Sequence, residues 1–433
     1  MKIFVLAVFI LMYVFIIALP KHKTWSTGIA ALITSVALII NKDFLIYEPF
    51  LNIKLDVIFM LVGIMVTVGM FADSKMPNKL ADKLVSKMPN ALFALVFLAI
   101  LSGVVSAVVD NVATVLMLAP IGIAVARKIN VSPIPVIISI AVSSNLQGAA
   151  TLVGDTTSIM LAEALGMNFF DFFVFQGKAS IFWAVELGMI FTIPILILIF
   201  RKDNKKLEYA MENVKVNTIA PTIILLVNFA LLVVSSFIDF QIKINGMDVT
   251  KGLICLACGL VSVIVYTISQ IIKLSDNLKN SLDLETIFFL IFLFIIIGCV
   301  EKVGIIADLG NAFSKIGSNN LFLLYTIIVF GSVIFSAFID NIPYVATMLP
   351  VINVLSTTLP AGASTVLYFG LLIGATLGGN LTTFGASANI VGIGILRKEG
   401  YDVKNADFFK IGIPFTLVAV LAGYVYTWLV WGI

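Results

Sequence analysis

The sequence predicts an all-α membrane protein with about 10 transmembrane helices and two re-entrant helical hairpins, arranged as two inverted-topology repeats. Three observations lead to this prediction: the composition, the apolar runs and an internal repeat. Of the 433 residues, 61% are hydrophobic and 12% are charged, and the mean hydropathy is +1.12. Soluble domains are about 45–50% apolar and about 25% charged, so this composition excludes a soluble globular protein.

Apolar runs between charged breaks reach or approach the roughly 20 residues that span a bilayer as a helix. They predict spans near residues 3–19, 26–41, 56–72, 133–163, 179–200, 218–238, 252–272, 285–301, 364–396 and 411–432. Two further stretches, 89–126 and 319–357, carry an Asp-Asn pair inside an apolar run. Polar breaks at membrane depth are tolerated only where the backbone is buried in protein or lines a cavity, so we interpret both stretches as re-entrant hairpins. If each stretch crossed twice instead, the loops would emerge on the same sides.

Lysine and arginine are concentrated in alternate loops. Of the 27 such residues, 19 lie in loops 20–25, 73–88, 127–132, 201–217, 273–284 and 397–410. Because cytoplasmic loops carry an excess of Lys and Arg, we expect these loops inside and both termini outside, in a multi-pass protein of the cell (plasma) membrane.

An internal repeat divides the chain into two halves. Residues 106–120 match 336–350, and residues 148–158 match 379–389. The first repeat covers 1–200 with hairpin 89–126 and a broken helix at 133–163. A cytoplasmic linker, 201–217, leads to the second repeat, 218–433, with hairpin 319–357 and a broken helix at 364–396. Each half holds five spans, an odd number, so the second half is expected upside down. Inverted repeats with interrupted helices are typical of alternating-access carriers, whose site lies between the repeats.

The hairpin tips carry Asp110-Asn111 and Asp340-Asn341. A carboxylate deep in lipid costs roughly 2.5–3.5 kcal/mol, so each aspartate requires a partner. Carboxylate and amide oxygens suit Na⁺, which makes these four residues candidate Na⁺ ligands, and a carboxylate could carry H⁺ instead. The alternative is that each Asp caps the second helix of its hairpin, and Pro343 fits the first turn of such a helix.

The broken helices contain glycine and small hydroxylic residues at 148–158 and 379–389. Such residues favour an unwound segment that offers backbone carbonyls to a cation. Asp155 has no counterpart, because Ala386 occupies the matching position, so the site is expected to be asymmetric. The alternative is close packing of small residues between helices.

These motifs resemble the ion transporter superfamily, in particular the branch of arsenite efflux permeases, NhaD-type sodium/proton antiporters and the melanosomal P protein. Sodium-coupled dicarboxylate and citrate carriers are more distant relatives. The resemblance implies a homodimer in which each subunit has a scaffold and a transport domain that moves as an elevator. It also places Thr114 and Thr347 on or near the tips, beside Asn111 and Asn341. The full set of candidate ion- or substrate-binding residues is Asp110, Asn111, Thr114, Gly154, Asp155, Thr156, Thr157, Ser158, Asp340, Asn341, Thr347, Asn380, Gly385, Ser387 and Asn389.

The sequence departs from the dicarboxylate branch in two ways. Aspartate replaces the serine of each tip, and Thr156-Thr157 and Ser387-Ala388 replace two prolines. The added carboxylates would repel a polyanionic organic substrate unless cations neutralise them.

We therefore expect a permease that moves a small ion, such as arsenite or Na⁺ in antiport with H⁺, coupled to Na⁺ or H⁺. The alternatives are a sodium-coupled citrate or dicarboxylate carrier and a passive ion channel. An enzyme is not expected, because intramembrane aspartyl proteases carry Gly-x-Gly-Asp and residues 152–155 lack the first glycine. No cofactor is expected apart from the coupling ion. Positive charge is dispersed, which argues against nucleic acid, and arsenite-type ATP drive would need a separate ATPase subunit, because the chain has no Walker motif.

Overall fold

The chain folds into long apolar helices with two small β-hairpins. The computed structural model describes residues 1–19, 22–203, 215–235, 237–238, 241–244, 246–270, 282–317, 320–357, 359 and 362–432. The elements are α1 (Lys2–Ala18), α2 (Lys23–Ile40), α3 (Glu48–Leu51), α4 (Leu55–Asp73), α5 (Met76–Val85), α6 (Ala91–Ser106), α7 (Asn111–Lys128), α8 (Pro133–Gln147), α9 (Thr156–Leu165), η2 (Phe170–Phe172), β1 (Val174–Phe175), β2 (Lys178–Ala179), α10 (Ile181–Phe200), η3 (Arg201–Asp203), α11 (Ala220–Ser235), β3 (Lys243–Ile244), β4 (Met247–Asp248), α12 (Thr250–Gln270), α14 (Leu284–Lys302), α15 (Ile305–Gly317), α16 (Leu321–Ser336), α17 (Asn341–Ser356), α18 (Ala363–Gly378), η4 (Gly379–Leu381), α19 (Ser387–Lys398) and α20 (Asn405–Trp431).

Among the described residues, seven helices are long and apolar enough to cross a membrane, and seven shorter helices are also apolar. The predicted all-α membrane fold class is therefore confirmed. Of the predicted linker 201–217, residues 204–214 lie outside the described residues. The number of crossings and the inverted arrangement of the repeats stay predictions.

Polar caps begin the first helix of each predicted hairpin. The side chain of Asn90 accepts a hydrogen bond from the amide of Phe93 at 2.9 Å, and that of Asn320 accepts one from Leu323 at 2.9 Å. The first amides of a helix have no partner within the helix, and in an apolar environment water does not supply one. Equivalent asparagines thus start α6 and α16.

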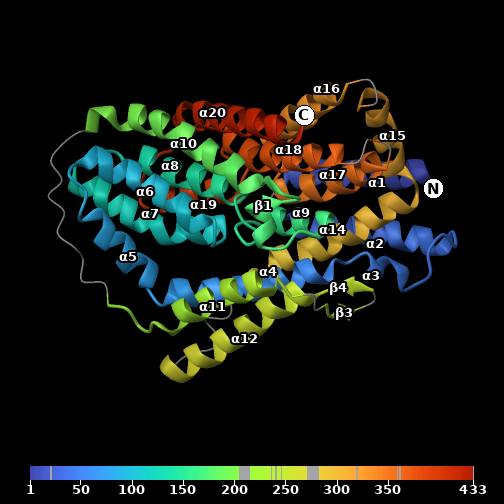
Figure 1. Cartoon of the computed structure of the whole chain (residues 1–433), viewed down its shortest axis with the longest axis horizontal. Helices are drawn as coiled ribbons and strands as arrows, with labels where there is room; N and C mark the ends of the chain where they lie inside the picture. Colours follow the sequence, from blue (N-terminus) through green and yellow to red (C-terminus); the bar gives the residue numbers. More distant parts are fainter. Residues whose placement is uncertain are drawn as a thin grey trace.

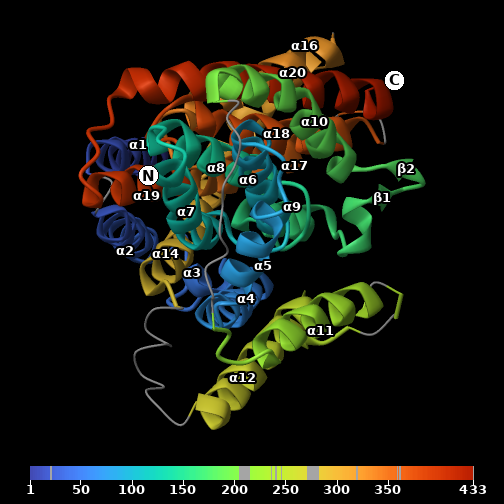
Figure 2. The same cartoon turned by 90° about the vertical axis from the view of Figure 1, so that its left-hand side faces the viewer.

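The most extensive helix packing occurs both within each half and between the halves. α6 packs on α8 and α16 on α18, while α4 packs on α12 and α2 on α14. α10 and α20 pack on each other, and Figure 1 shows them running side by side. α4 and α12 approach so closely that a Cβ on Gly63 would lie 2.1 Å from the main chain of Cys255. In Figure 2, α11 and α12 extend away from the remaining helices, which they meet mainly through α4.

Four helix interruptions lie at matching positions of the two halves. The chain leaves helix between α6 and α7 and between α16 and α17, after Ser106 and Ser336. It is also interrupted between α8 and α9 and between α18 and α19, after Gln147 and Gly378. Figure 1 shows α6, α7 and α8 in one half of the molecule and α16 and α17 in the other. The interruptions place polar backbone and side chains in the interior.

The β-hairpins are short. Val174 pairs with Ala179 and Phe175 with Lys178, around a turn in which Gly177 has a positive φ. In the second hairpin, Lys243 pairs with Asp248 and Ile244 with Met247.

Candidate ion-binding site at the helix interruptions

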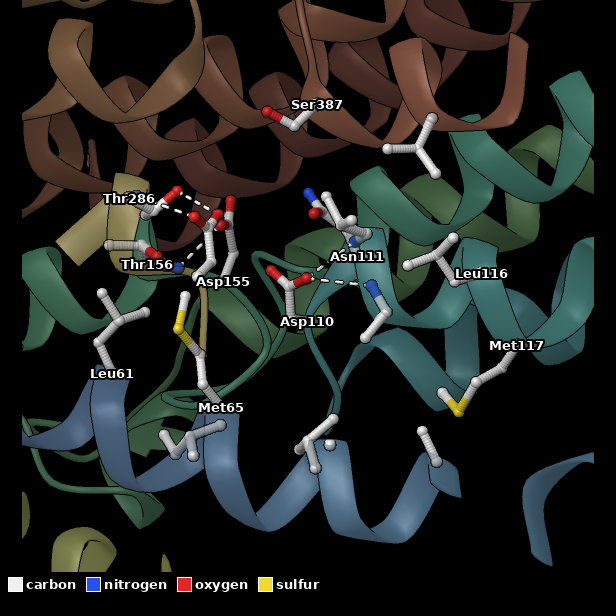
Figure 3. Close-up of a pocket in the computed structure, with 18 of the residues that line it drawn as sticks. Leu61, Met65, Asp110, Asn111, Leu116, Met117, Asp155, Thr156, Thr286 and Ser387 are labelled. Carbon is white, nitrogen blue, oxygen red and sulfur yellow. Dashed lines mark hydrogen bonds between the residues drawn. The ribbon is translucent and has the colours of Figure 1, made fainter. Parts of the chain in front are cut away.

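A cavity of about 1510 Å³ lies where the interruptions meet. Its wall is built from the starts of α7, α9, α17 and α19, from one face of α4 and from the starts of α2 and α14. Figure 3 shows Asp110, Asn111 and Asp155 around one space, with Ser387 on one side and Leu61 and Met65 of α4 on the other. The candidate residues that line the cavity are Asp110, Asn111, Gly154, Asp155, Thr156, Asp340, Asn341 and Ser387.

The exposed part of the lining comes mainly from loops and helix ends. It includes Lys75, Lys215, Asn217, Asp283 and Glu285. The first four lie in loops that the charge distribution predicts to be cytoplasmic. The cavity therefore opens toward the predicted inner side.

The first hairpin tip is held by helix capping. Asp110 is the N-cap of α7, and its Oδ2 accepts hydrogen bonds from the amides of Val112 and Ala113 at 3.0 and 3.1 Å. The capping alternative thus describes this aspartate, which still lines the cavity.

The second tip has the same backbone and a different side-chain environment. φ and ψ are −47° and 141° at Asp110 and −49° and 142° at Asp340. Pro343 occupies the position of Ala113 and has no amide hydrogen to donate. Within the described residues, the Asp340 carboxylate accepts no hydrogen bond from the start of α17. Instead its Oδ2 lies 3.1 Å from Lys23 Nζ and accepts from Ser387 Oγ at 3.3 Å.

Asp155 supplies the third carboxylate. It is buried and accepts hydrogen bonds from the Thr156 amide at 2.7 Å and the Thr157 hydroxyl at 2.9 Å. The negative charges of Asp110 and Asp340 both act on it. Ala386 stands at the matching place before α19. Three carboxylates from both halves of the chain thus face one space.

A buried asparagine joins the two tips. Asn145 Oδ1 accepts hydrogen bonds from the amide nitrogens of Asn111 at 3.0 Å and Asn341 at 3.4 Å. Asn145 Nδ2 donates to the Thr376 carbonyl at 2.7 Å and to Asn380 Oδ1 at 3.1 Å. Side chains from both hairpins therefore share one acceptor, although Asn145 and Asn341 are 196 residues apart in the sequence.

Each broken segment is clamped against the hairpin turn of its own half. The hydroxyl of Thr151 donates to the Ala107 carbonyl, and the hydroxyl of Thr382 donates to Ala337. A Cβ on Gly154 would lie 2.6 Å from the Gly148 carbonyl oxygen. Close approach of main chain to main chain explains glycine at this position.

A second hydrogen bond joins the end of each interrupted segment, 148–158 and 379–389, to its beginning. Ser158 Oγ donates to the Gly148 carbonyl at 3.1 Å, and Asn389 Nδ2 donates to Gly379 at 3.0 Å. These residues occupy matching positions and shape the segment without lining the cavity.

The remaining candidates also lie behind the cavity wall. Thr114 is buried, with its hydroxyl 3.5 Å from the Val109 carbonyl. Thr347 lies about two helical turns past the tip, and its Oγ1 is 2.6 Å from the hydroxyl of Tyr13. Asn380, Gly385 and Thr157 support the wall through main-chain or side-chain contacts.

The sequence interpretation missed Asn145 and Lys23. Asn145 lies inside a predicted span, in Ser143-Ser144-Asn145, and a polar run at membrane depth is a signal that could have found it. Lys23 was counted only as a topology charge. Asp283 caps α14, and Glu285 follows it at the cavity mouth.

The charge of the lining favours cations. It contains six acidic residues and three lysines. A cleft lined mainly by one sign of charge concentrates counter-ions. Within the described residues no group of three or more His, Cys, Asp or Glu is placed to hold a metal ion together.

Comparison with known proteins shows which family the chain belongs to. The family model described as citrate transporter, CitMHS, matches residues 6–368. The chain belongs to the CitMHS transporter family. It is similar to the 46 kDa membrane protein of Mycobacterium leprae, with 29% identity over 99% of both chains. It is also 24% identical to the human P protein over 73% of this chain and 46% of that protein. The crystal structure of the Alcanivorax borkumensis YdaH transporter matches with a TM-score of 0.59 and 14% identity, covering 88% of this chain and 86% of that one.

Membership of CitMHS confirms the predicted resemblance to the ion transporter superfamily and the expectation of a membrane transporter rather than an enzyme. The likeness to the YdaH transporter concerns the fold alone.

Proposed function

We propose that this CitMHS protein is a secondary active transporter that moves a small ion, coupled to Na⁺ or H⁺, by elevator-type alternating access. The observation that carries the proposal is the cavity in which Asp110, Asp155 and Asp340 meet. Carboxylates at membrane depth require a cation, and aspartates from both halves let one ion interact with both hairpins.

The direction of the opening supports an inward-facing state. The exposed lining residues lie in loops that carry the predicted cytoplasmic charge. Alternating access then requires α7, α9, α17 and α19, which carry the site, to move relative to α2, α4 and α14. We place the protein in the cell membrane as a homodimer, so that a fixed scaffold could anchor this movement.

A sodium-coupled organic anion carrier is the second candidate, and two observations favour it. The family description names citrate, and Lys23 places a positive charge in the cavity beside Asp340. A tricarboxylate would then bind only after cations have neutralised the aspartates.

Proteoliposomes test the proposal. Purified protein is reconstituted with arsenite, ²²Na⁺ or citrate as the labelled solute, and Na⁺ and pH gradients are imposed separately. Accumulation against the solute's own gradient, driven by one of these ions, is the expected result. Flux that ignores both gradients would refute coupling, and resolvable unitary currents in planar bilayers would indicate a channel.

A further inference from the structure

We propose that Lys23 is a built-in counter-cation of the coupling site: its ammonium group occupies the cation position at Asp340, and Na⁺ binds there by displacing it. This inference rests on the proposed function, because it assigns the coupling cation and its competitor. It gives Lys23 a role in ion selectivity and exchange.

The geometry of Lys23 is that of a bound cation. It is the first residue of α2, and its Nζ lies 3.1 Å from Asp340 Oδ2 and 5.2 Å from the centre of the Phe289 ring. The side chains of Lys23 and Asp340 are only 17% and 19% exposed. Ser387 Oγ contributes a neutral oxygen beside the same carboxylate oxygen.

Asp340 is available for exchange because the helix does not hold it. Two main-chain amides fix Asp110 in the first tip, those of Val112 and Ala113. In the second tip Pro343 stands at the position of Ala113 and has no amide hydrogen to donate. The Asp110 carboxylate is fixed through Oδ2 by two main-chain amides, whereas the Oδ2 of Asp340 is held only by the side chains of Lys23 and Ser387. The two halves thus carry, on the same backbone, one aspartate fixed by the amides of its helix and one held only by side chains.

The cost of an unpaired charge explains why one cation must replace another. Removing one partner from a partly buried ion pair leaves the other charge desolvated and uncompensated. Lys23 therefore keeps Asp340 neutralised when Na⁺ is absent, and Na⁺ takes over when it binds. After displacement, Lys23 stays beside Phe289 and within the field of Asp283 and Glu285.

The pair also joins two parts of the molecule. Lys23 belongs to α2, which packs mainly on α14, and Asp340 starts α17. A movement of the tip relative to α2 must break the pair. Na⁺ binding would prepare that movement by breaking the pair first.

The test is a Na⁺ titration of thermal unfolding with purified full-length protein in detergent, in which choline chloride keeps the ionic strength constant. Lys23→Gln removes the competitor, and Lys2→Gln serves as the control, because Lys2 pairs with Asp308 on the surface at 2.5 Å. A site that Lys23 occupies part of the time has a proportionally weaker apparent affinity for Na⁺. We therefore expect the half-saturating Na⁺ concentration to be about five- to tenfold lower in Lys23→Gln, and unchanged in Lys2→Gln.

A second readout uses the wild-type chain. An amine-reactive ester should label Lys23 faster in NaCl than in choline chloride, measured by mass spectrometry against Lys2. In Asp340→Asn the fast labelling should appear without Na⁺.

The outcomes separate the two proposals. If Na⁺ stimulates transport but changes neither Lys23 labelling nor the titration of Lys23→Gln, the Lys23 inference is overturned and the transporter proposal stands. If H⁺ alone drives transport, the inference again fails and the proposed function survives. If neither cation drives transport, both fail.

Discussion

Replacing Gly385 with alanine tests whether the broken helix must press against the hairpin turn. A Cβ at this position would lie 2.7 Å from the carbonyl oxygens of Gly379 and Ser336 and 2.9 Å from that of Ala337. All three atoms belong to the main chain, so none can move aside by a side-chain rotation. The methyl group is accommodated only if the segment after η4 moves away from the turn between α16 and α17.

The size of the effect follows from this crowding. Inserting a methyl group into a packed interior costs about 1–3 kcal/mol, which reduces the population of the clamped arrangement roughly 5- to 150-fold. The Thr382 contact with Ala337 would open at the same time. Because Asp340 follows this turn, we expect coupled flux to fall by a similar factor.

The assay is gradient-driven uptake into proteoliposomes at matched protein density. Gly394→Ala is the matched control, because within the described part of the chain no atom comes within 4 Å of a Cβ there, and alanine is a better helix former than glycine. We expect Gly394→Ala to transport like the wild type. Equal flux in Gly385→Ala and Gly394→Ala would refute the requirement for close contact between the broken helix at Gly385 and the turn between α16 and α17.

Three further predictions concern the tips and the surface. Ala113→Pro copies the second tip and removes one of the two amides that cap Asp110, so thermal stability should fall by about 1 kcal/mol without loss of folding; an unfolded variant would contradict the equivalence of the tips. Asn145→Ala should reduce flux at least about tenfold, because unsatisfied buried amides cost roughly 1–3 kcal/mol each, and wild-type uptake would contradict its bridging role. Arg127→Gln breaks an exposed 2.7 Å pair with Glu399 and should leave the unfolding temperature unchanged, and a clear drop would show that the pair stabilises the fold.

Local chemistry made part of this structure predictable. The Asp-Asn pairs coincide with the starts of α7 and α17, because each aspartate interrupts an apolar run at the N-cap position, and at α7 its side chain also caps the helix. The glycines near 148–158 and 379–389 mark segments where helices stop. These features depend on residues close in sequence, and hydropathy and capping describe such residues well.

Long-range contacts could not be predicted in the same way. The bond between Asn145 and Asn341 spans 196 residues, and the pair between Lys23 and Asp340 spans 317. Hydropathy treats Lys23 as a loop charge, and only the folded chain, in which α2 packs on α14 and α14 contacts α17, brings it to the tip. Thr347 was expected on or near the tip, and its hydroxyl lies against that of Tyr13.

Uphill transport by Asp340→Asn and Asp110→Asn, beside the wild type, tests the central claim most directly. Asparagine keeps the size and capping ability of aspartate, so any loss reports the missing charge rather than a broken helix. The wild type should concentrate its solute when a Na⁺ or H⁺ gradient is imposed, and Asp340→Asn should only equilibrate it. Accumulation at the wild-type level in both variants would contradict the assignment of cation coupling to this cavity.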